Sequence, residues 1–117
     1  MTFVSYARAD SEFALKLVRD VKSRGARVWL DQLDLEPGQR WDKAVENALA
    51  RCERVLVILS PAAVESDHVM NEISYAQGER KTIIPLLHRQ CSVPLRLRSL
   101  HYVDFRQEYD GGLKSLL

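Results

Sequence analysis

The sequence predicts a doubly wound α/β domain, in which helices cover both faces of a parallel sheet. Short apolar segments alternate along the chain with longer segments whose apolar residues recur at helical spacing. Residues 54–60, RVLVILS, are apolar on both faces, as the centre of a parallel sheet requires. The chain has 117 residues, 46% of them hydrophobic and 28% charged, which is typical of one globular domain.

The first part of the chain is expected to form two strands and two helices. Residues 2–6, TFVSY, form the first strand, and the sequence Asp-Ser-Glu at 10–12 is typical of a helix start. That helix ends at Gly25, and residues 27–31, RVWLD, form the second strand. A loop follows over 32–40, where Pro and Gly are adjacent. The second helix then has its inner face at Trp41, Ala44, Val45, Ala48 and Leu49.

The second part repeats this alternation. Residues 54–60 form the third strand, and a third helix begins near Ser66, a residue that favours helix N-caps. Residues 82–87, TIIPLL, form the fourth strand, and the proline within it indicates an edge or near-edge position. Residues 101–105, HYVDF, form the fifth strand, and the chain ends within a last helix. We therefore expect a single domain over residues 1–117.

Single helices between the strands imply right-handed crossovers, and we expect the flavodoxin-like strand order 2-1-3-4-5. Ligands of such sheets bind beyond the carboxyl ends of the strands, where the order reverses. The segments that leave those ends are SYARAD, DQLDLEPGQR and SPAAVES, and they are rich in polar residues. A functional site is expected among them.

Charge and composition exclude several classes of partner and location. The net charge is +1, from 17 basic and 16 acidic residues, so no overall field attracts nucleic acid or a membrane. No apolar run of about 18 residues or signal-peptide pattern is present. Cys52 and Cys91 lie far apart and outside any C-x-x-C pattern, which is typical of reduced thiols. We expect a cytoplasmic protein.

Common cofactor and catalytic motifs are absent. There is no G-x-G-x-x-G or G-x-x-x-x-G-K-[ST] loop for phosphates, and no G-x-S-x-G elbow. The three histidines have no Cys or His partners at ligand spacing, so no metal site is predicted. Ser60 stands where a receiver domain needs its phosphoacceptor aspartate, and with Pro61 it is interpreted as the exit from a strand.

Glu72 is the candidate functional carboxylate. On a helix that starts at Ser66, His68 and Glu72 are i and i+4 neighbours beside the buried stripe of that helix. The pair therefore borders the core near the carboxyl end of the sheet. Local chemistry leaves two interpretations, a functional carboxylate or a solvated glutamate favoured by the helix N-terminus.

Four segments taken in order carry a family resemblance: FVSYARAD, VWLDQLDLEPGQRWDKAVENAL, RVLVILSPAAVESDHVMNE and VDF. Together they resemble a Toll/interleukin-receptor (TIR) domain, and they are most similar to the bacterial, enzymatic branch. FVSY resembles the first box of the family, LEPG its proline-glycine BB loop, and S-x-H-V-x-x-E the helix whose glutamate is catalytic in members that cleave NAD⁺. The resemblance covers nearly the whole chain.

The resemblance implies an NAD⁺ glycohydrolase, in which Glu72 is catalytic and NAD⁺ is the substrate rather than a cofactor. Nicotinamide leaves a pyridinium as a neutral molecule, so no general acid is required, unlike in ordinary glycosidases. An ionised carboxylate can stabilise the ribosyl oxocarbenium ion. Attack by water gives ADP-ribose, and attack by the adenine of the substrate gives a cyclic product.

The resemblance also implies the substrate-binding residues. Tyr6 and Arg8 would hold the dinucleotide, Asp31 and Trp41 would flank the ribose and the nicotinamide, and Ser66 would order the helix start. His68 replaces the tryptophan of enzymatic relatives, and an imidazole there can pack beside the carboxylate and hydrogen-bond to it. The alternatives are packing for the two aromatic residues and a surface salt bridge between Arg8 and Asp31. The implied set is Ser5, Tyr6, Arg8, Asp31, Trp41, Ser66 and His68.

A second set of residues concerns assembly. The resemblance implies that the BB loop docks against a second TIR domain and that self-assembly activates the enzyme, as in immune or anti-phage effectors. A fused sensor domain in a longer protein is also expected. The alternative is a non-catalytic interaction module with the same loop, whereas a nucleoside-processing hydrolase is disfavoured by that loop. The loop residues are Leu33, Asp34, Leu35, Glu36, Pro37 and Gly38.

Overall fold

The computed structural model describes residues 1–117 and contains one five-stranded parallel sheet. Its strand order is β2-β1-β3-β4-β5, which confirms the predicted fold class. Phe3 in β1 pairs with Trp29 in β2 and with Val55 in β3, so β1 lies inside the sheet. The strands are β1 (Thr2–Ser5), β2 (Val28–Trp29), β3 (Arg54–Leu59), β4 (Thr82–Leu87) and β5 (Val103–Asp104).

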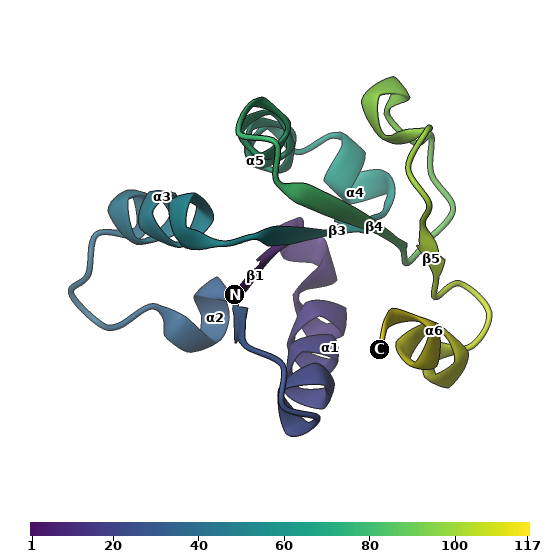
Figure 1. Ribbon diagram of the computed structural model, residues 1–117, viewed down its shortest axis with the longest axis horizontal. Helices are drawn as coiled ribbons and strands as arrows, with labels where there is room; N and C mark the ends of the chain where they lie inside the picture. The colour runs from purple at the N-terminus through teal and green to yellow at the C-terminus, as the bar shows by residue number, and fades with distance from the viewer.

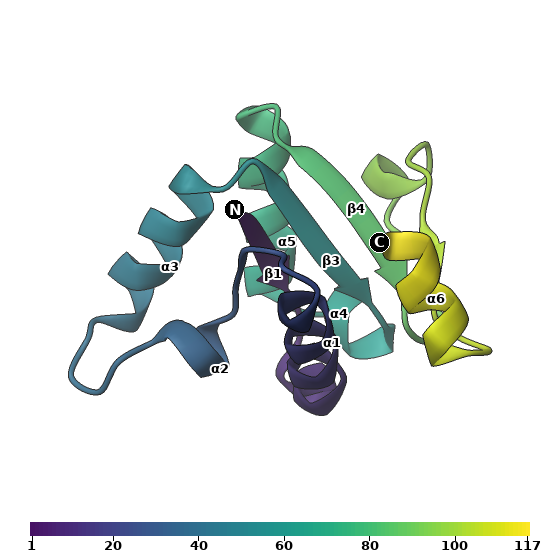
Figure 2. The same cartoon turned by 60° about the horizontal axis from the view of Figure 1, so that its bottom comes forward.

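Helices cover both faces of the sheet. Helices α4 and α5 lie on one side of the strands and α1 and α6 on the other (Figure 1). Figure 2 shows α2 and α3 on the β1 side of the sheet and α6 on the β4 side. The helices are α1 (Ser11–Ser23), α2 (Asp31–Asp34), α3 (Trp41–Arg51), α4 (Pro61–Val64), α5 (Asp67–Gly78) and α6 (Tyr109–Leu116), with 3₁₀ turns η1 (Arg8–Asp10) and η2 (Leu95–Leu97).

Two apolar cores, one on each face, explain the apolar pattern of β3. Val55, Val57 and Leu59 belong to the core beneath α3, α4 and α5, whereas Leu56 and Ile58 belong to the core beneath α1 and α6. Successive side chains of a strand point to opposite faces, so a strand covered on both sides must be apolar throughout.

Two short helices correct the sequence-based prediction. The sequence predicts a strand that continues to residue 31 and then a loop, but Asp31–Asp34 form α2. The carboxylate of Asp34 accepts a hydrogen bond of 2.8 Å from the backbone N–H of Leu30, which closes this turn. Strand β2 has β1 as its only neighbour and pairs with it at Thr2 and Phe3, so residues after Trp29 have no strand to pair with.

The exit from β3 is helical as well. The sequence predicts that a loop starts at Ser60, but the Ser60 hydroxyl accepts a hydrogen bond of 3.1 Å from the N–H of Ala63 and caps α4. Pro61 occupies the first turn, where a missing N–H costs nothing. Ser60 also donates a hydrogen bond of 2.5 Å to Asp10, and both side chains are buried. This hydroxyl therefore has a structural role.

The proline in β4 lies near the edge of the sheet, as predicted. Pro85 pairs with Val57 of β3. The short strand β5 begins to pair with β4 only at Leu86, one residue later. The side of β4 that faces β5 therefore needs no ladder hydrogen bond at the proline.

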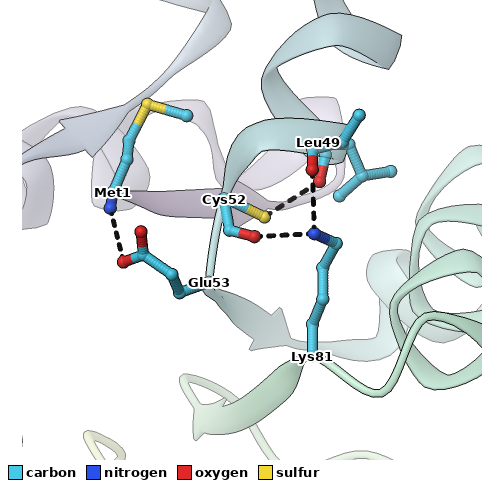
Figure 3. Close-up of polar contacts among 6 residues, drawn as sticks. Met1, Leu49, Cys52, Glu53 and Lys81 are labelled. Atoms are coloured by element: carbon cyan, nitrogen blue, oxygen red, sulfur yellow. Dashed lines mark hydrogen bonds and ion pairs between the residues drawn. The ribbon is translucent and has the colours of Figure 1, made fainter.

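Lys81 anchors the end of α3, next to the start of β4. Its ammonium donates hydrogen bonds of 3.0 Å to the carbonyl of Ala50 and 2.7 Å to that of Cys52, while the Cys52 thiol donates to the carbonyl of Leu49 (Figure 3). A cation at a helix C-terminus satisfies the last carbonyls and opposes the helix dipole. The C-terminal end of α3 is thus tied to the sheet.

None of the helices combines the length and the apolar character that crossing a membrane demands.

Candidate functional site

Five of the seven residues in the predicted substrate-binding set line one cavity of about 320 Å³. It lies beyond the carboxyl ends of β1 and β2, where the fold class predicts a site. Segments from the β1 exit, α2, α3 and α5 contribute to its wall. The cavity is lined by Tyr6, Arg8, Ser11, Asp31, Gln32, Leu35, Trp41 and His68.

Glu72 lies behind this cavity, on α5. The Ser5 hydroxyl donates a hydrogen bond of 2.5 Å to Oε1 of Glu72, and Ser5 itself is only 1% exposed. Burial raises the pKa of Glu72 from 4.5 to about 7; the hydrogen bond from Ser5 and the charge of His68 oppose this shift, and the charge of Asp31 adds to it. The carboxyl group is therefore poised between its two protonation states at neutral pH.

Tyr6 and Asp31 form a hydrogen-bonded pair across the cavity. The phenol of Tyr6 donates to Oδ1 of Asp31, which also accepts a hydrogen bond of 2.8 Å from the backbone N–H of Gln32. Burial, followed by the hydrogen bond to Asp31, raises the pKa of Tyr6, so the phenol stays protonated. Arg8 makes no ion pair with Asp31, which excludes the salt-bridge interpretation in this structure.

His68 joins the start of α5 to the end of β1. Its Nε2 lies 3.1 Å from the carbonyl oxygen of Tyr6, and its Nδ1 lies 2.9 Å from Oγ of Ser66. A carbonyl can only accept, so the N–H of Nε2 donates to Tyr6, and the partner of Nδ1 is the Ser66 oxygen, which also accepts from the N–H of Val69. Both ring nitrogens are occupied, so the expected hydrogen bond from His68 to Glu72 is not formed.

Trp41 separates two hollows. It was predicted on the inner face of the second helix, but it is the first residue of α3 and is 49% exposed. On one side lies the cavity described above; on the other lies a hollow of about 560 Å³ between α3 and α5, here named the α3–α5 groove, which includes Glu72 in its wall. A narrow pocket of about 10 Å³, with room for about one water molecule, touches Tyr6, Asp31, Trp41, His68 and Glu72.

The predicted assembly loop is only partly a loop. Leu33 and Asp34 belong to α2, and Asp34 also pairs with Lys22 at 3.9 Å. Leu35 lines the cavity. The residues that follow, Glu36 to Gly38, are exposed, and Gly38 has φ +82°, a conformation that favours glycine.

Several lining residues were missed from the sequence. Ser11 and Gln32 line the cavity; Gln32 stands in the segment that leaves β2 and Ser11 directly follows the segment that leaves β1, which was the available signal. Tyr75 lines the groove three residues after Glu72 on the same face of α5. Asn71, beside Glu72, carried no signal of its own in the sequence.

This arrangement places the carboxyl group of Glu72, which has a pKa of about 7, beside a polar cavity and a groove with aromatic walls. Glu72 has no second carboxylic acid hydrogen-bonded to it. The pair of Tyr6 and Asp31 offers a carboxylate oxygen and a hydroxyl to a polyhydroxyl ligand, and Arg8 offers a charged guanidinium to an anionic one. The geometry suits a ligand with a sugar, an anionic group and an aromatic ring.

Comparisons with known proteins give a consistent family. A profile described as TIR domain matches residues 2–117. The chain is 30% identical over 91 residues to the NAD(+) hydrolase TcpA of Theionarchaea archaeon (strain DG-70-1). The aligned region covers 74% of this chain and 28% of that protein. It is 26% identical over 88 residues to the probable 2′ cyclic ADP-D-ribose synthase BdTIR of Brachypodium distachyon. The aligned region covers 74% of this chain and 39% of that protein.

A solved structure with a similar fold belongs to the same family. The crystal structure of the TIR domain of the Toll-related receptor TRR-2 from Hydra magnipapillata is similar with a TM-score of 0.79 and 26% identity, covering 89% of this chain and 82% of that one. The chain spans between 18% and 39% of the length of the curated relatives that it matches. With its profile match, strand order and cavity at the switch point, the chain belongs to the TIR domain family.

Proposed function

We propose that this domain cleaves the bond between nicotinamide and ribose in NAD⁺, with Glu72 as the catalytic carboxylate. The observation that carries the proposal is the position of Glu72, held by Ser5 at 2.5 Å and bordering both the α3–α5 groove and the narrow pocket beside Tyr6 and Asp31. Two similar proteins, an NAD(+) hydrolase and a probable cyclic ADP-ribose synthase, support the choice of substrate.

The chemistry needs one carboxylate. As the bond from C1′ to the ring nitrogen breaks, its electron pair goes to the nitrogen and nicotinamide leaves as a neutral molecule. The ribose is left as an oxocarbenium ion, and an ionised Glu72 nearby stabilises that charge. Water then adds to C1′ and loses a proton, or the adenine of the same substrate attacks and gives a cyclic product.

The other residues of the predicted set have supporting roles in this proposal. The hydroxyl and carboxylate of the pair of Tyr6 and Asp31 bind ribose hydroxyls, and the unpaired guanidinium of Arg8 faces the phosphates. Ser66 caps α5 and, with His68, fixes the helix that carries Glu72. Trp41 packs on the substrate at the border of the two hollows.

Activation by self-assembly is part of the proposal. The segment from Glu36 to Gly38 is exposed, which suits a loop that docks on a second copy. If the competent state is completed by a neighbour, isolated domains populate it at a small fraction and the activity falls by that fraction. Such a switch suits an immune or anti-phage effector triggered by a fused sensor domain.

The direct test is to incubate the purified domain with NAD⁺ and measure free nicotinamide by chromatography. Wild-type protein at high concentration should release nicotinamide, and Glu72→Gln should release none while keeping its circular dichroism spectrum. Activity of Glu72→Gln within threefold of wild type would overturn the assignment of Glu72.

The second candidate is a non-catalytic interaction module. The exposed loop and the 40% exposed side chain of Leu33 support this module as much as they support a self-assembling enzyme. Self-association with no nicotinamide release, from monomer and assembly alike, would favour this module and reject the enzyme.

A further inference from the structure

A second cavity, of about 400 Å³, lies beside the substrate cavity at the carboxyl ends of β1 and β4. The two cavities share Arg8 and Ser11 in their walls. The wall of the second cavity includes Asp10 and His88, which form with Ser60 a polar cluster that the proposed reaction does not use. Because its members follow β1, β3 and β4, the cluster joins three loops at one edge of the sheet.

Asp10 is a buried carboxyl group with an incomplete set of partners. The residue is 5% exposed. Its Oδ2 accepts the hydrogen bond of 2.5 Å from Ser60, whereas its Oδ1 has no hydrogen bond within the protein and lies 3.9 Å from Nε2 of His88. That distance is about 1 Å longer than a charge-assisted hydrogen bond. A buried carboxylate is stabilised by a paired cation, so a charge on His88 would attract it strongly.

The imidazole of His88 is held in place on the other side of this gap. Its ring stacks on Phe13 with 3.9 Å between the ring centroids, and its backbone N–H donates a hydrogen bond of 3.0 Å to the carbonyl of Leu59. The side chain is 18% exposed, so a proton from solvent can reach it. A stronger attraction between the two groups therefore acts mainly on Asp10 and the turn that carries it.

Both burial and charge act on His88. Burial lowers its pKa, the charge of Asp10 opposes this shift, and the charge of Arg89 adds to it. The ring is therefore neutral at neutral pH and gains its proton under acidic conditions. The other titratable groups that line the cavity or interact electrostatically with Asp10 are Arg8, Glu12 and Cys91.

The η1 turn connects this cluster to the substrate cavity. It consists of Arg8, Ala9 and Asp10, so the guanidinium at the substrate cavity and the buried carboxyl group are two residues apart. The N–H of Asp10 donates a hydrogen bond of 2.8 Å to the carbonyl of Ala7. The hydroxyl of Ser11 donates one of 2.5 Å to the carbonyl of Arg8. A turn closed in this way moves as a unit, so a shift of Asp10 displaces Arg8.

We propose that Asp10 is a positioning residue for Arg8, and that protonation of His88 draws Asp10 towards the imidazolium and weakens binding of the dinucleotide. The inference rests on the proposed function and adds a pH-dependent control of substrate affinity. With His88 neutral, Arg8 lines the substrate cavity as in this structure. With His88 protonated, the ion pair closes the gap of 3.9 Å and moves the turn. Misplacement of a positioning group by about 1 Å has a large effect on a bound substrate.

The coupling is tested first on the free domain. Isotope-labelled protein is titrated from pH 8 to pH 5, and NMR follows the ring signals of His88 and the amide signals of Arg8 and Ala9. We expect the two amides to follow the midpoint of the His88 ring, and this component to be absent from His88→Gln. His68 and Glu72 also titrate, but they are unchanged in both proteins. Amide signals that titrate in His88→Gln as in the wild type would overturn the proposal.

The binding test uses NAD⁺ and the Glu72→Gln variant, which the proposed mechanism makes inactive and which removes the titration of Glu72. Calorimetry at pH 8 and pH 5.5 measures the affinity. We expect the dissociation constant to rise roughly three- to tenfold on acidification, which is part of the effect of losing a charged contact outright. Adding His88→Gln should remove this rise, whereas adding His101→Gln, at an exposed histidine, should keep it. The same rise with His88→Gln would contradict the proposal.

Asp10→Asn separates positioning from a purely structural role. The amide has nearly the shape of the carboxylate but no charge to attract an imidazolium, so the affinity for NAD⁺ should lose its dependence on pH. A purely structural Asp10 would change stability and leave that dependence as it is in the parent protein, which would reject the positioning role. If Asp10→Asn does not fold, the comparison of His88→Gln with His101→Gln decides.

The outcomes also separate this proposal from the proposed function. Protonation of Glu72 should lower kcat, whereas protonation of His88 should raise KM for NAD⁺. Nicotinamide release with a KM whose pH dependence is unchanged by His88→Gln would reject the positioning role and keep the enzyme. NAD⁺ binding that depends on His88 without any nicotinamide release would reject the enzyme and keep the positioning role. Absence of NAD⁺ binding at every pH would reject both.

Discussion

Ser5 and Glu72, which are 67 residues apart in the sequence, are joined by a hydrogen bond of 2.5 Å from the hydroxyl to the carboxylate. Ser5 ends β1 and Glu72 lies on α5, so the contact ties the candidate catalytic helix to the sheet. Burial and this hydrogen bond act on the pKa of Glu72 in opposite directions, and burial has the larger effect. The state of one carboxyl group therefore depends on the packing of α5 against β1.

Glu72→Gln should make the fold more stable at neutral and alkaline pH. The folded-state pKa of Glu72, about 7, lies above the ordinary value of 4.5, so the carboxyl group favours folding below pH 4.5 and loses that contribution as the pH rises through 7. The amide keeps the hydrogen bond from Ser5 without the charge. We expect a gain of about 1–2 kcal/mol in the free energy of unfolding at pH 8, after allowance for partial exposure.

Urea unfolding at pH 8 and at pH 4.5 measures this difference. At the lower pH the advantage of the variant should be smaller, because the wild-type carboxyl group is then protonated in the folded state. Glu46→Gln, at an exposed position of α3, is the control and should change stability little at either pH. A lower stability of Glu72→Gln at pH 8 would contradict the buried, raised-pKa description.

Ser5→Ala should move the acid limb of the pH–rate profile to higher pH. The hydrogen bond from Ser5 lowers the pKa of Glu72, so its loss raises that pKa and reduces the ionised fraction at pH 7. Hydrogen bonds to charged groups are worth about 1.5–3 kcal/mol, so kcat/KM for NAD⁺ at pH 7 should fall roughly tenfold. Activity should recover towards wild type as the pH rises, and a pH-independent loss would show that Ser5 acts in another way.

His68→Ala should destabilise the domain by about 1–2 kcal/mol, because it removes the side-chain contacts to Ser66 and to the carbonyl of Tyr6. His101→Ala is the matched control, since that histidine is exposed and has no side-chain hydrogen bond. Thermal or urea unfolding at neutral pH compares the two. Equal stability of the two variants would show that the bridge from α5 to β1 contributes nothing.

Gly38→Asp should suppress assembly-dependent activity. Gly38 has φ +82°, so any side chain strains the exposed loop, and aspartate adds a charge to the proposed docking surface. The specific activity of the wild type should rise with protein concentration, and that of the variant should stay low. Gly78→Asp, at an exposed glycine with an ordinary backbone conformation, is the control. Constant turnover per wild-type molecule from nanomolar to micromolar concentration would reject activation by assembly.

Local sequence patterns determined the buried central strand β3 and the start of α5. Residues 54–59 are apolar throughout because β3 is covered on both faces, and Ser66 caps α5 with a hydrogen bond of 3.4 Å from Val69. Both are short-range effects of side-chain alternation and capping, so they can be read from neighbouring residues. The four segments taken together likewise identified the family that the profile confirms.

Only the tertiary structure decided what Glu72 and His68 contact. Their spacing predicted two side chains on one face of α5, but His68 binds Ser66 and the carbonyl of Tyr6, while Glu72 binds Ser5. The partner of a side chain depends on which backbone lies opposite it, and β1 is more than 60 residues away from α5 in the sequence. For the same reason the sequence did not reveal the groove, which exists only because α3 and α5 pack beside each other.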